Sequence, residues 1–265
     1  MGLRRFLRKR GWELLARVED PQLRTLNYLK KIKSGQFTGD AGELEFFNFC
    51  LEYYSKSTGE NFQDLFAFWM LKQKKNGVYI EFGATDGVFG SNSLMLEREG
   101  WRGILSEPAK CWHQRLKQNR PNATIDFRCV WKETGNQLEF SECEAEGLST
   151  IKEFSNLDHH ADVREKSVHY MVTTVTLNDL LDQHGLSGAD YLSIDTEGSE
   201  FEILRAWDPA KHPISIITVE HNYVEKNRNA IEKLMCSRGY VPMLRKFSQF
   251  DDWYVHSSLC KLGFV

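Results

Sequence analysis

The sequence of 265 residues lacks several features that identify common classes of protein. It has no apolar run approaching about 20 residues, so we expect no membrane-spanning helix. Its six cysteines include no C-x-x-C pair and no group with histidines at zinc spacing, which argues against a zinc module. Scattered cysteines with no recognisable secretory leader favour buried free thiols in a reduced, cytoplasmic protein.

An excess of basic charge is also missing. The formal net charge is -3, so we expect no nucleic-acid partner. The basic residues that stand out are at the start, in MGLRRFLRKRGW. Residues 3–18 could form a basic amphipathic helix, or they could be a solvated leader. We therefore expect at most a weak peripheral contact with an anionic membrane there.

Two regions of different pattern follow one another along the chain. Residues 1–75 carry clustered aromatic residues, and we interpret them as a helical N-terminal extension. In residues 76–265, short apolar strands alternate with helices, which is typical of a mostly parallel α/β sheet. The length suits one such domain together with the extension.

The α/β region predicts a definite series of elements. Strands are expected over 78–82, 103–107, 124–130, 190–195 and 214–220, with helices over 91–100, 109–119, 176–185 and 226–237. Ser91 is a candidate helix cap, and Thr176 with Asp179 has capping-box spacing. The segments NQLEFSE and VHYMVTTV alternate as strands do. The last two strands, YVPML and DWYVH, are expected to form a closing hairpin with no helix between them.

Acidic residues follow four of the predicted strands. Because ligands of open parallel sheets bind at the carboxyl ends of the strands, we expect these residues to share a cleft. Isolated buried carboxylates are costly, so a group of them indicates ligands or partners rather than packing. The residues are Glu81, Asp86, Glu107, Asp195, Glu197 and Glu220.

The loop after the first strand reads EFGATDGVFG over residues 81–90. Gly83 and Gly87 permit a tight turn and a close approach of the backbone to a ligand. The loop is neither G-x-G-x-x-G nor a P-loop, and its acids would repel a pyrophosphate. A ligand with a sulfonium and an ammonium, such as S-adenosylmethionine, suits these acids. Glu107, 20 residues beyond Gly87, is placed to accept hydrogen bonds from ribose hydroxyls.

Four short motifs resemble those of the FkbM family of methyltransferases. They are E-F-G-A-T-D-G at 81–87, S-E-P at 106–108, I-D-T-E-G-S-E at 194–200 and T-V-E-H at 218–221, and their order and spacing agree over about residues 60–256. The first motif departs from the commoner D-x-G-A-N form, with Glu81 in place of Asp and Thr85 in place of Asn.

The resemblance implies a class I methyltransferase, with a Rossmann-like, mostly parallel seven-stranded sheet flanked by helices. It implies S-adenosylmethionine as methyl donor and a hydroxyl of a sugar, glycan or small natural product as acceptor. On this basis the expected cofactor-binding residues are Glu81, Gly83, Ala84, Thr85, Asp86, Gly87, Glu107, Pro108, Val130 and Asp195.

The candidates for the catalytic base are Asp195, Glu220 and His221, which end adjacent strands. A histidine titrates near neutrality, which suits a base, although it could equally be a structural hydrogen-bonding group. Asp195 could instead hold the methionine ammonium. No metal site is predicted, although the three candidates together with Glu197 could ligate a divalent ion.

Two other functions remain open on the sequence. A nicotinamide-dependent oxidoreductase is disfavoured by the missing G-x-G-x-x-G, and a non-catalytic binding module is disfavoured by the acids at the strand ends. Nucleic-acid methylation is disfavoured because neither N-P-P-Y nor D-P-P-Y occurs. Residues 141–170, with His159, His160 and His169, are either a solvated loop or a lid over the acceptor.

Overall fold

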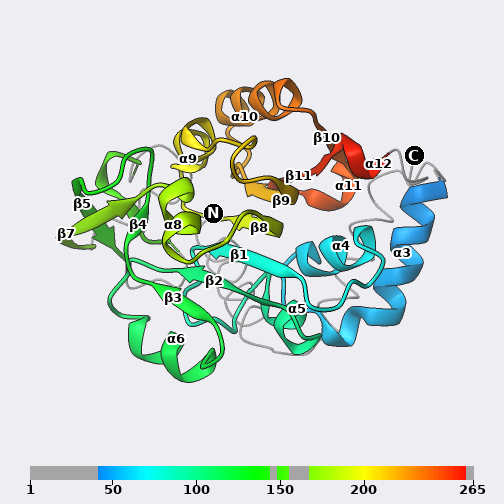
Figure 1. The fold of residues 1–265 in the computed structure, drawn as a ribbon, viewed down its shortest axis with the longest axis horizontal. Helices are drawn as coiled ribbons and strands as arrows, with labels where there is room; N and C mark the ends of the chain where they lie inside the picture. Colours follow the sequence, from blue (N-terminus) through cyan, green and yellow to red (C-terminus); the bar gives the residue numbers. More distant parts are fainter. Residues whose placement is uncertain (1–40, 144–147, 155–166, 261–265) are drawn as a thin grey trace, which may run out of the picture. The chain divides into compact units, whose positions relative to one another are not determined.

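The computed structural model describes residues 41–143, 148–154 and 167–260 (Figure 1). The basic segment 3–18, His159 and His160 lie outside these residues. Among the described residues, no helix is long and apolar enough to cross a membrane.

The chain forms two compact units, of which the first ends at Lys56 and the second begins at Ser57. The first contains the helices α3 (Ala41–Tyr53) and η1 (Tyr54–Lys56). An N-terminal extension that reaches residue 75 stays a prediction.

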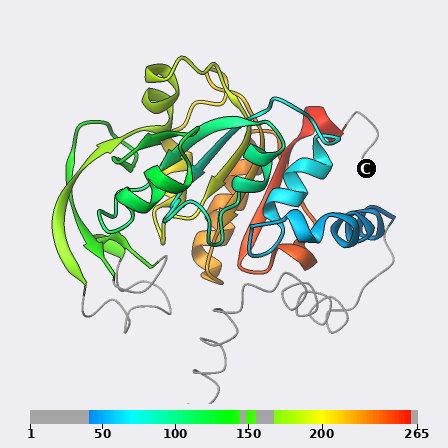
Figure 2. The same ribbon diagram turned by 90° about the horizontal axis from the view of Figure 1, so that it is seen from below.

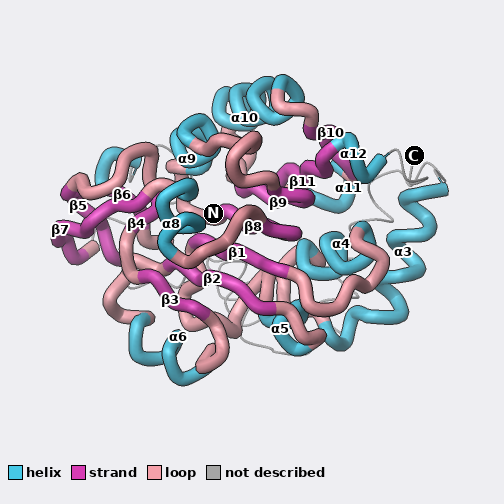
Figure 3. Tube along the Cα trace, viewed as in Figure 1, coloured by secondary structure: helices cyan, strands magenta, loops and turns pink. Residues whose placement is uncertain are grey.

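The second unit is built on a seven-stranded sheet of order β10-β11-β9-β8-β1-β2-β3 (Figure 3). Its strands are β1 (Val78–Phe82), β2 (Arg102–Ser106), β3 (Thr124–Asp126), β8 (Ala189–Ile194), β9 (Ile214–Glu220), β10 (Tyr240–Met243) and β11 (Asp251–His256). All neighbouring strands are parallel except at β11, which runs antiparallel to both β9 and β10. This arrangement confirms the expected class I methyltransferase sheet with its closing hairpin.

Helices cover both faces of this sheet (Figure 1). On one side lie α4 (Gln63–Met70), α5 (Leu94–Arg98) and α6 (His113–Asn119), and on the other α8 (Leu177–Gln183), α9 (Glu200–Ala206) and α10 (Glu225–Ser237). The second face is filled by aliphatic side chains such as Leu180, Leu204 and Met235, which are fully buried against the strands. Removing this much apolar surface from water is the main force that holds such layers together.

A second, four-stranded sheet of order β4-β7-β5-β6 lies at the opposite end of the unit from β11 (Figure 2). It comprises β4 (Cys129–Val130), β5 (Gln137–Glu142), β6 (Thr150–Ile151) and β7 (Val168–Val175), with the short helix η2 (Lys152–Phe154) after β6. The two alternating segments expected within 135–175 are therefore strands, and they pair antiparallel to each other.

Local signals in the sequence mark several element boundaries correctly. The Thr176 side chain accepts from the Asp179 amide at 3.0 Å, so the expected cap of α8 is confirmed. The cap expected at Ser91 was wrong, because α5 begins at Leu94 with Ser93 as its N-cap, although Ser91 Oγ accepts from the Leu94 amide at 3.2 Å. Gly100 and Gly185 adopt positive φ just beyond the helices that they end, a conformation that glycine reaches without steric cost.

Two further expectations about the elements were wrong. Residues 124–130 are not one strand, because the Asp126 side chain accepts from the Arg128 amide at 2.8 Å and turns the chain from β3 into β4. The last two strands do have a helix between them, the four-residue α11 (Arg245–Ser248). A further short helix, α12 (Ser257–Cys260), follows β11.

Candidate functional site

The sheet reverses its winding between β1 and β8, because the chain continues from β1 to β2 and β3 and then returns to place β8 on the other side. Loops that follow strands on either side of such a point leave a crevice at the carboxyl edge of the sheet. Two adjoining cavities occupy this position, and Gly83, Thr85, Trp112 and Asp195 line both of them.

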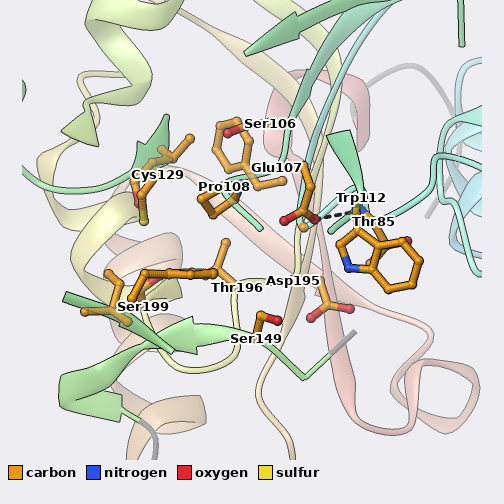
Figure 4. A pocket seen from close by; sticks show the side chains of 15 residues that line it. Thr85, Ser106, Glu107, Pro108, Trp112, Cys129, Ser149, Asp195, Thr196 and Ser199 are labelled. Atoms are coloured by element: carbon orange, nitrogen blue, oxygen red, sulfur yellow. Dashed lines mark hydrogen bonds between the residues drawn. The ribbon is translucent and has the colours of Figure 1, made fainter. Parts of the chain in front are cut away.

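The narrower cavity lies beside β2 and β4 (Figure 4). Glu107 and Asp195 bring their carboxylates to it from different loops, with Trp112 beside them. Pro108 and Val130 contribute apolar surface. The cavity therefore has hydrogen-bond acceptors at one end and an apolar wall beside them. Such a lining suits a nucleoside, which has polar ribose hydroxyls and a flat base.

Glu107 is more deeply embedded than its place at a strand end suggests. The side chain is 4% exposed, and its two oxygens accept from the Thr85 amide at 2.8 Å and the Ala109 amide at 2.7 Å. Burial raises the pKa of Glu107 to about 7, against the opposing effect of these two hydrogen bonds. The residue thus fastens the loop after β1 to the loop after β2.

The wider cavity has a volume of about 560 Å³ and is lined by the loops after β1, β8 and β9. This volume lies within the range of small-molecule sites. Every acid expected at the strand ends except Glu107 reaches it, and Glu60 from the loop before α4 joins them. The acidic lining is Glu60, Glu81, Asp86, Asp195, Glu197 and Glu220.

Three of these acids form a tight group. Oxygens of Asp195, Glu197 and Glu220 all lie within 4.8 Å of one another. Burial, with a smaller contribution from Asp195, raises the pKa of Glu220 well above its usual value. Burial likewise raises the pKa of Asp195 to about 7. A hydrogen bond between Asp195 and Glu220 requires one of the two to hold a proton. Such a group can take up a proton or hold a cation.

Asn222 holds two members of this group in place. Its Nδ2 donates to Glu220 Oε2 at 2.9 Å and to Glu197 Oε2 at 3.2 Å. Asn222 is not among the residues predicted from the sequence, because a single Asn after a strand carries no distinguishing signal.

His221 does not line either cavity. The ring is 3% exposed; its Nδ1 accepts from the Tyr223 amide at 3.1 Å, and its Nε2 lies 4.0 Å from Asp252 Oδ1. Burial lowers the pKa of His221, although Asp252 opposes this effect. The structure therefore brings Asp195 and Glu220 together and leaves the third candidate base outside the cavity.

Glu81 lines the wider cavity, but its carboxylate is fixed by protein donors. It accepts from Ser91 Oγ at 2.9 Å, the Asn92 amide at 2.7 Å and Ser93 Oγ at 2.5 Å. Arg120, fully buried, lies 3.9 Å away. These contacts join the end of β1 to the start of α5, so Glu81 shapes the loop that the cavity uses.

Arg120 was missed in the sequence, where nothing sets it apart from other arginines. Its guanidinium donates to the Gly87 carbonyl at 3.0 Å and to Glu97 at 2.8 Å. A Cβ on Gly87 would lie 2.6 Å from Arg120 Cγ. Gly87 lines neither cavity and is needed for this packing.

Four residues other than glycine that line the cavities have left-handed backbone. They are Thr85, Glu197, Asn222 and Tyr223, with φ between 46° and 57°. This conformation is unfavourable for residues with a Cβ, so the surrounding contacts must hold it. Gly83, with φ 78°, is required for a different reason, because a Cβ there would lie 1.9 Å from the Asp195 carbonyl oxygen.

The model of the methyltransferase FkbM domain family matches residues 81–242. No curated protein is significantly similar in sequence. Among solved structures, an O-methyltransferase from Bacillus cereus in complex with SAH is 10% identical, covering 85% of this chain and 94% of that chain with a TM-score of 0.41. A precorrin-6y C5,15-methyltransferase from Geobacter metallireducens is 13% identical, covering 68% and 71% with a TM-score of 0.40.

The family match covers more than half of the chain and includes the loop after β1, Glu107, Asp195 and Glu220. The chain therefore belongs to the FkbM family of methyltransferases, whose methyl donor is S-adenosylmethionine.

Proposed function

We propose that this methyltransferase transfers the methyl group to a hydroxyl of a sugar, a glycan or a small natural product. The observation that carries the proposal is the pair Asp195 and Glu220, whose carboxylate oxygens lie within 4.8 Å of each other at a cavity that adjoins the predicted donor site. A hydroxyl needs a base to take its proton as its oxygen is methylated, and a carboxylate with a pKa near neutrality suits that task.

The residues present fit the donor. Glu107 uses one acceptor position on each oxygen for a backbone amide, and a carboxylate oxygen has a second position left for a ribose hydroxyl. Gly83 leaves space that a Cβ would fill. The acids of the wider cavity favour a ligand with a sulfonium and an ammonium. We propose the donor-binding set Glu81, Gly83, Ala84, Thr85, Asp86, Glu107, Pro108, Val130 and Asp195, with Gly87 supporting the loop.

When bound, S-adenosylmethionine supplies an activated methyl group that needs no further activation. The protein must hold the acceptor hydroxyl in line with it, which lowers the barrier by up to roughly 7–11 kcal/mol in ideal cases. Asp195, as the carboxylate, accepts the hydroxyl proton. Before the reaction, Glu220 is protonated and donates a hydrogen bond to Asp195 without transferring its proton. Asn222 fixes the orientation of Glu220.

Calorimetry with S-adenosylmethionine and S-adenosylhomocysteine tests the donor site. We expect micromolar binding of both and none of NADH, because the acidic lining opposes a pyrophosphate. Glu107→Ala should weaken binding by about 1.5–3 kcal/mol, the worth of hydrogen bonds to a charged group. Glu133→Ala, at an exposed position that lines neither cavity, is the control. Binding of NADH without either S-adenosyl ligand would instead support an oxidoreductase.

Transfer of a labelled methyl group to a panel of hydroxylated acceptors tests the reaction. If the protein binds the donor but methylates no acceptor of the panel and nothing in a glycan extract, a non-catalytic module on the same fold is favoured.

We also propose that the protein is located in the cytoplasm, since Cys50, Cys129 and Cys143 are buried free thiols.

A further inference from the structure

The loop after β2 connects that strand to α6 and carries two residues of the narrower cavity, Glu107 and Trp112 (Figure 4). Between them the backbone makes a tight turn, in which the Trp112 amide donates to the Ala109 carbonyl at 3.2 Å. The Ala109 amide donates to Glu107 Oε1 at 2.7 Å, so the direction of this carboxylate depends on the turn. A turn that leads into a helix leaves its first amides without helical partners, and Trp112, the N-cap residue of α6, has no side-chain acceptor for them.

Two residues of the second sheet accept the next two amides of the turn. Tyr170 of β7 accepts from the Lys110 amide at 2.9 Å, and Glu142 of β5 accepts from the Cys111 amide at 3.2 Å. The Tyr170 hydroxyl in turn donates to the same Glu142 oxygen at 2.5 Å. Tyr170 lies opposite Phe140 in the antiparallel pair β5 and β7, so Glu142, two positions further along β5, is on the same face of the sheet. The two acceptors therefore act as one unit.

Glu142 and Tyr170 line neither cavity, so they can affect a ligand only through the loop that they hold. Trp112 also attaches the loop to the second sheet, because its ring packs into the apolar cluster of that sheet. Apolar packing has little directional preference, whereas hydrogen bonds to consecutive amides fix the orientation of the peptide groups. The peptide groups held in this way directly follow Ala109, whose amide aligns Glu107.

We propose that Tyr170 and Glu142 are positioning residues for the methyl donor, because they hold the turn that orients Glu107 toward the ribose of S-adenosylmethionine. The inference rests on the proposed role of Glu107 and adds two residues that lie outside both cavities. The second sheet is then a functional part of the donor site as well as a cover for it.

Calorimetry with S-adenosylhomocysteine on the full chain, together with thermal unfolding, tests the inference. Tyr170→Phe removes the hydroxyl and keeps the ring, and we expect the dissociation constant to rise at least fivefold. Tyr240→Phe is the matched control, because the buried Tyr240 hydroxyl donates to the Ile214 carbonyl and Tyr240 lines neither cavity. It should lower Tm at least as much as Tyr170→Phe does, and it should leave the dissociation constant within twofold of normal.

Two replacements at Glu142 separate the hydrogen bonds from the general effect of a substitution. Glu142→Gln keeps an oxygen that can accept from the Cys111 amide and the Tyr170 hydroxyl, so its dissociation constant should stay within about twofold of normal. Glu142→Leu keeps no acceptor, and its dissociation constant should rise at least fivefold. Equal affinities of the two variants overturn the inference.

A double-mutant cycle tests whether Tyr170 acts through Glu107. In a chain that already carries Glu107→Ala, Tyr170→Phe should cost less than a further twofold, since the carboxylate that the turn orients is then missing. An equal loss in both backgrounds overturns the inference. A large loss from Glu107→Ala with none from Tyr170→Phe overturns the inference alone, whereas unchanged affinity of Glu107→Ala overturns the proposed role of Glu107 and the inference with it.

Discussion

Asp195 is the residue on which the proposed chemistry depends most. Asp195→Asn keeps the shape of the side chain and removes its basicity. We expect turnover to fall on the order of 10²-fold or more, with little change in melting temperature. In the unaltered enzyme, kcat/KM, which reports the free protein, should rise with pH through about 7, because burial raises the pKa of Asp195 to about 7 and only the ionised form accepts a proton.

Binding measurements separate the roles open to Asp195. A base leaves the dissociation constant of S-adenosylmethionine nearly unchanged in the Asn variant, whereas a ligand of the donor's ammonium raises it. Loss of activity in the unaltered enzyme on adding a chelator would assign the group Asp195, Glu197 and Glu220 to a divalent ion. Near-normal turnover of Asp195→Asn would rule out all three roles.

His221 acts in this structure through the loop that follows it. Its Nδ1 accepts from the Tyr223 amide, which supports the left-handed turn that places Asn222 against Glu220. We expect His221→Asn to stay within a few-fold of normal turnover, because an Asn oxygen can accept the same hydrogen bond. His221→Leu cannot, and its turnover should fall at least tenfold. If His221 were the base, both variants would lose on the order of 10²-fold or more of their turnover, and the residual turnover of both would lack the low-pH limb.

At the scale of elements, the close contact between the loops after β1 and β8 fixes the site. A Cβ on Gly83 would collide with the Asp195 carbonyl, so Gly83→Ala must separate the two loops. We expect at least a tenfold loss of affinity for S-adenosylhomocysteine in calorimetry. Gly185→Ala is the matched control, because Gly185 also has positive φ but has nothing within 4 Å of the added Cβ. It should lose only about 1 kcal/mol of stability. Equal effects of the two substitutions on affinity would contradict this view of the loops.

The whole molecule carries a surplus of buried acids, and this determines how its stability depends on pH. Burial raises the pKa of Glu107 and of Asp195 to about 7, whereas in the unfolded chain such groups ionise near 4. Between these values the folded state binds more protons, so the free energy of unfolding falls as pH rises. Thermal unfolding should give a lower Tm at pH 7.5 than at pH 5.5, by a few degrees, since about 1 kcal/mol moves Tm by roughly 2–4 °C at this size.

Glu107→Gln and Asp195→Asn provide the controls for this fall of Tm with pH. Each removes one of the two titrating groups, so Tm should depend less on pH in either variant. S-adenosylmethionine should also reduce this dependence, since a cation lowers the pKa of nearby acids. A Tm that rises over this pH interval in the unaltered protein would show that the raised pKa values do not govern its stability.

The sequence by itself determined the alternation of strands and helices and the edge of the sheet that carries the site. Short, mostly apolar runs such as 214–220 predict buried strands, and acids at the ends of parallel strands meet at one edge of the sheet. Caps and terminal glycines marked helix ends because their signals are local. The same local information failed at residues 124–130, where a hydrogen bond from the Arg128 amide to the Asp126 side chain turns the chain between two strands.

Only the tertiary structure decided which of the acids face the cavity and how each is held. Glu81 is held by donors of the loop at Ser91, Asn92 and Ser93, with Arg120 lying 3.9 Å away, and Glu107 is held by the Thr85 amide, 22 positions away in the sequence. His221 and Glu220 are neighbours in the chain, yet only Glu220 lines the cavity. These outcomes depend on contacts between distant segments. Glu220 is the last residue of β9 and His221 is the first of the following loop, so the contacts of that loop decide which of the two meets a ligand.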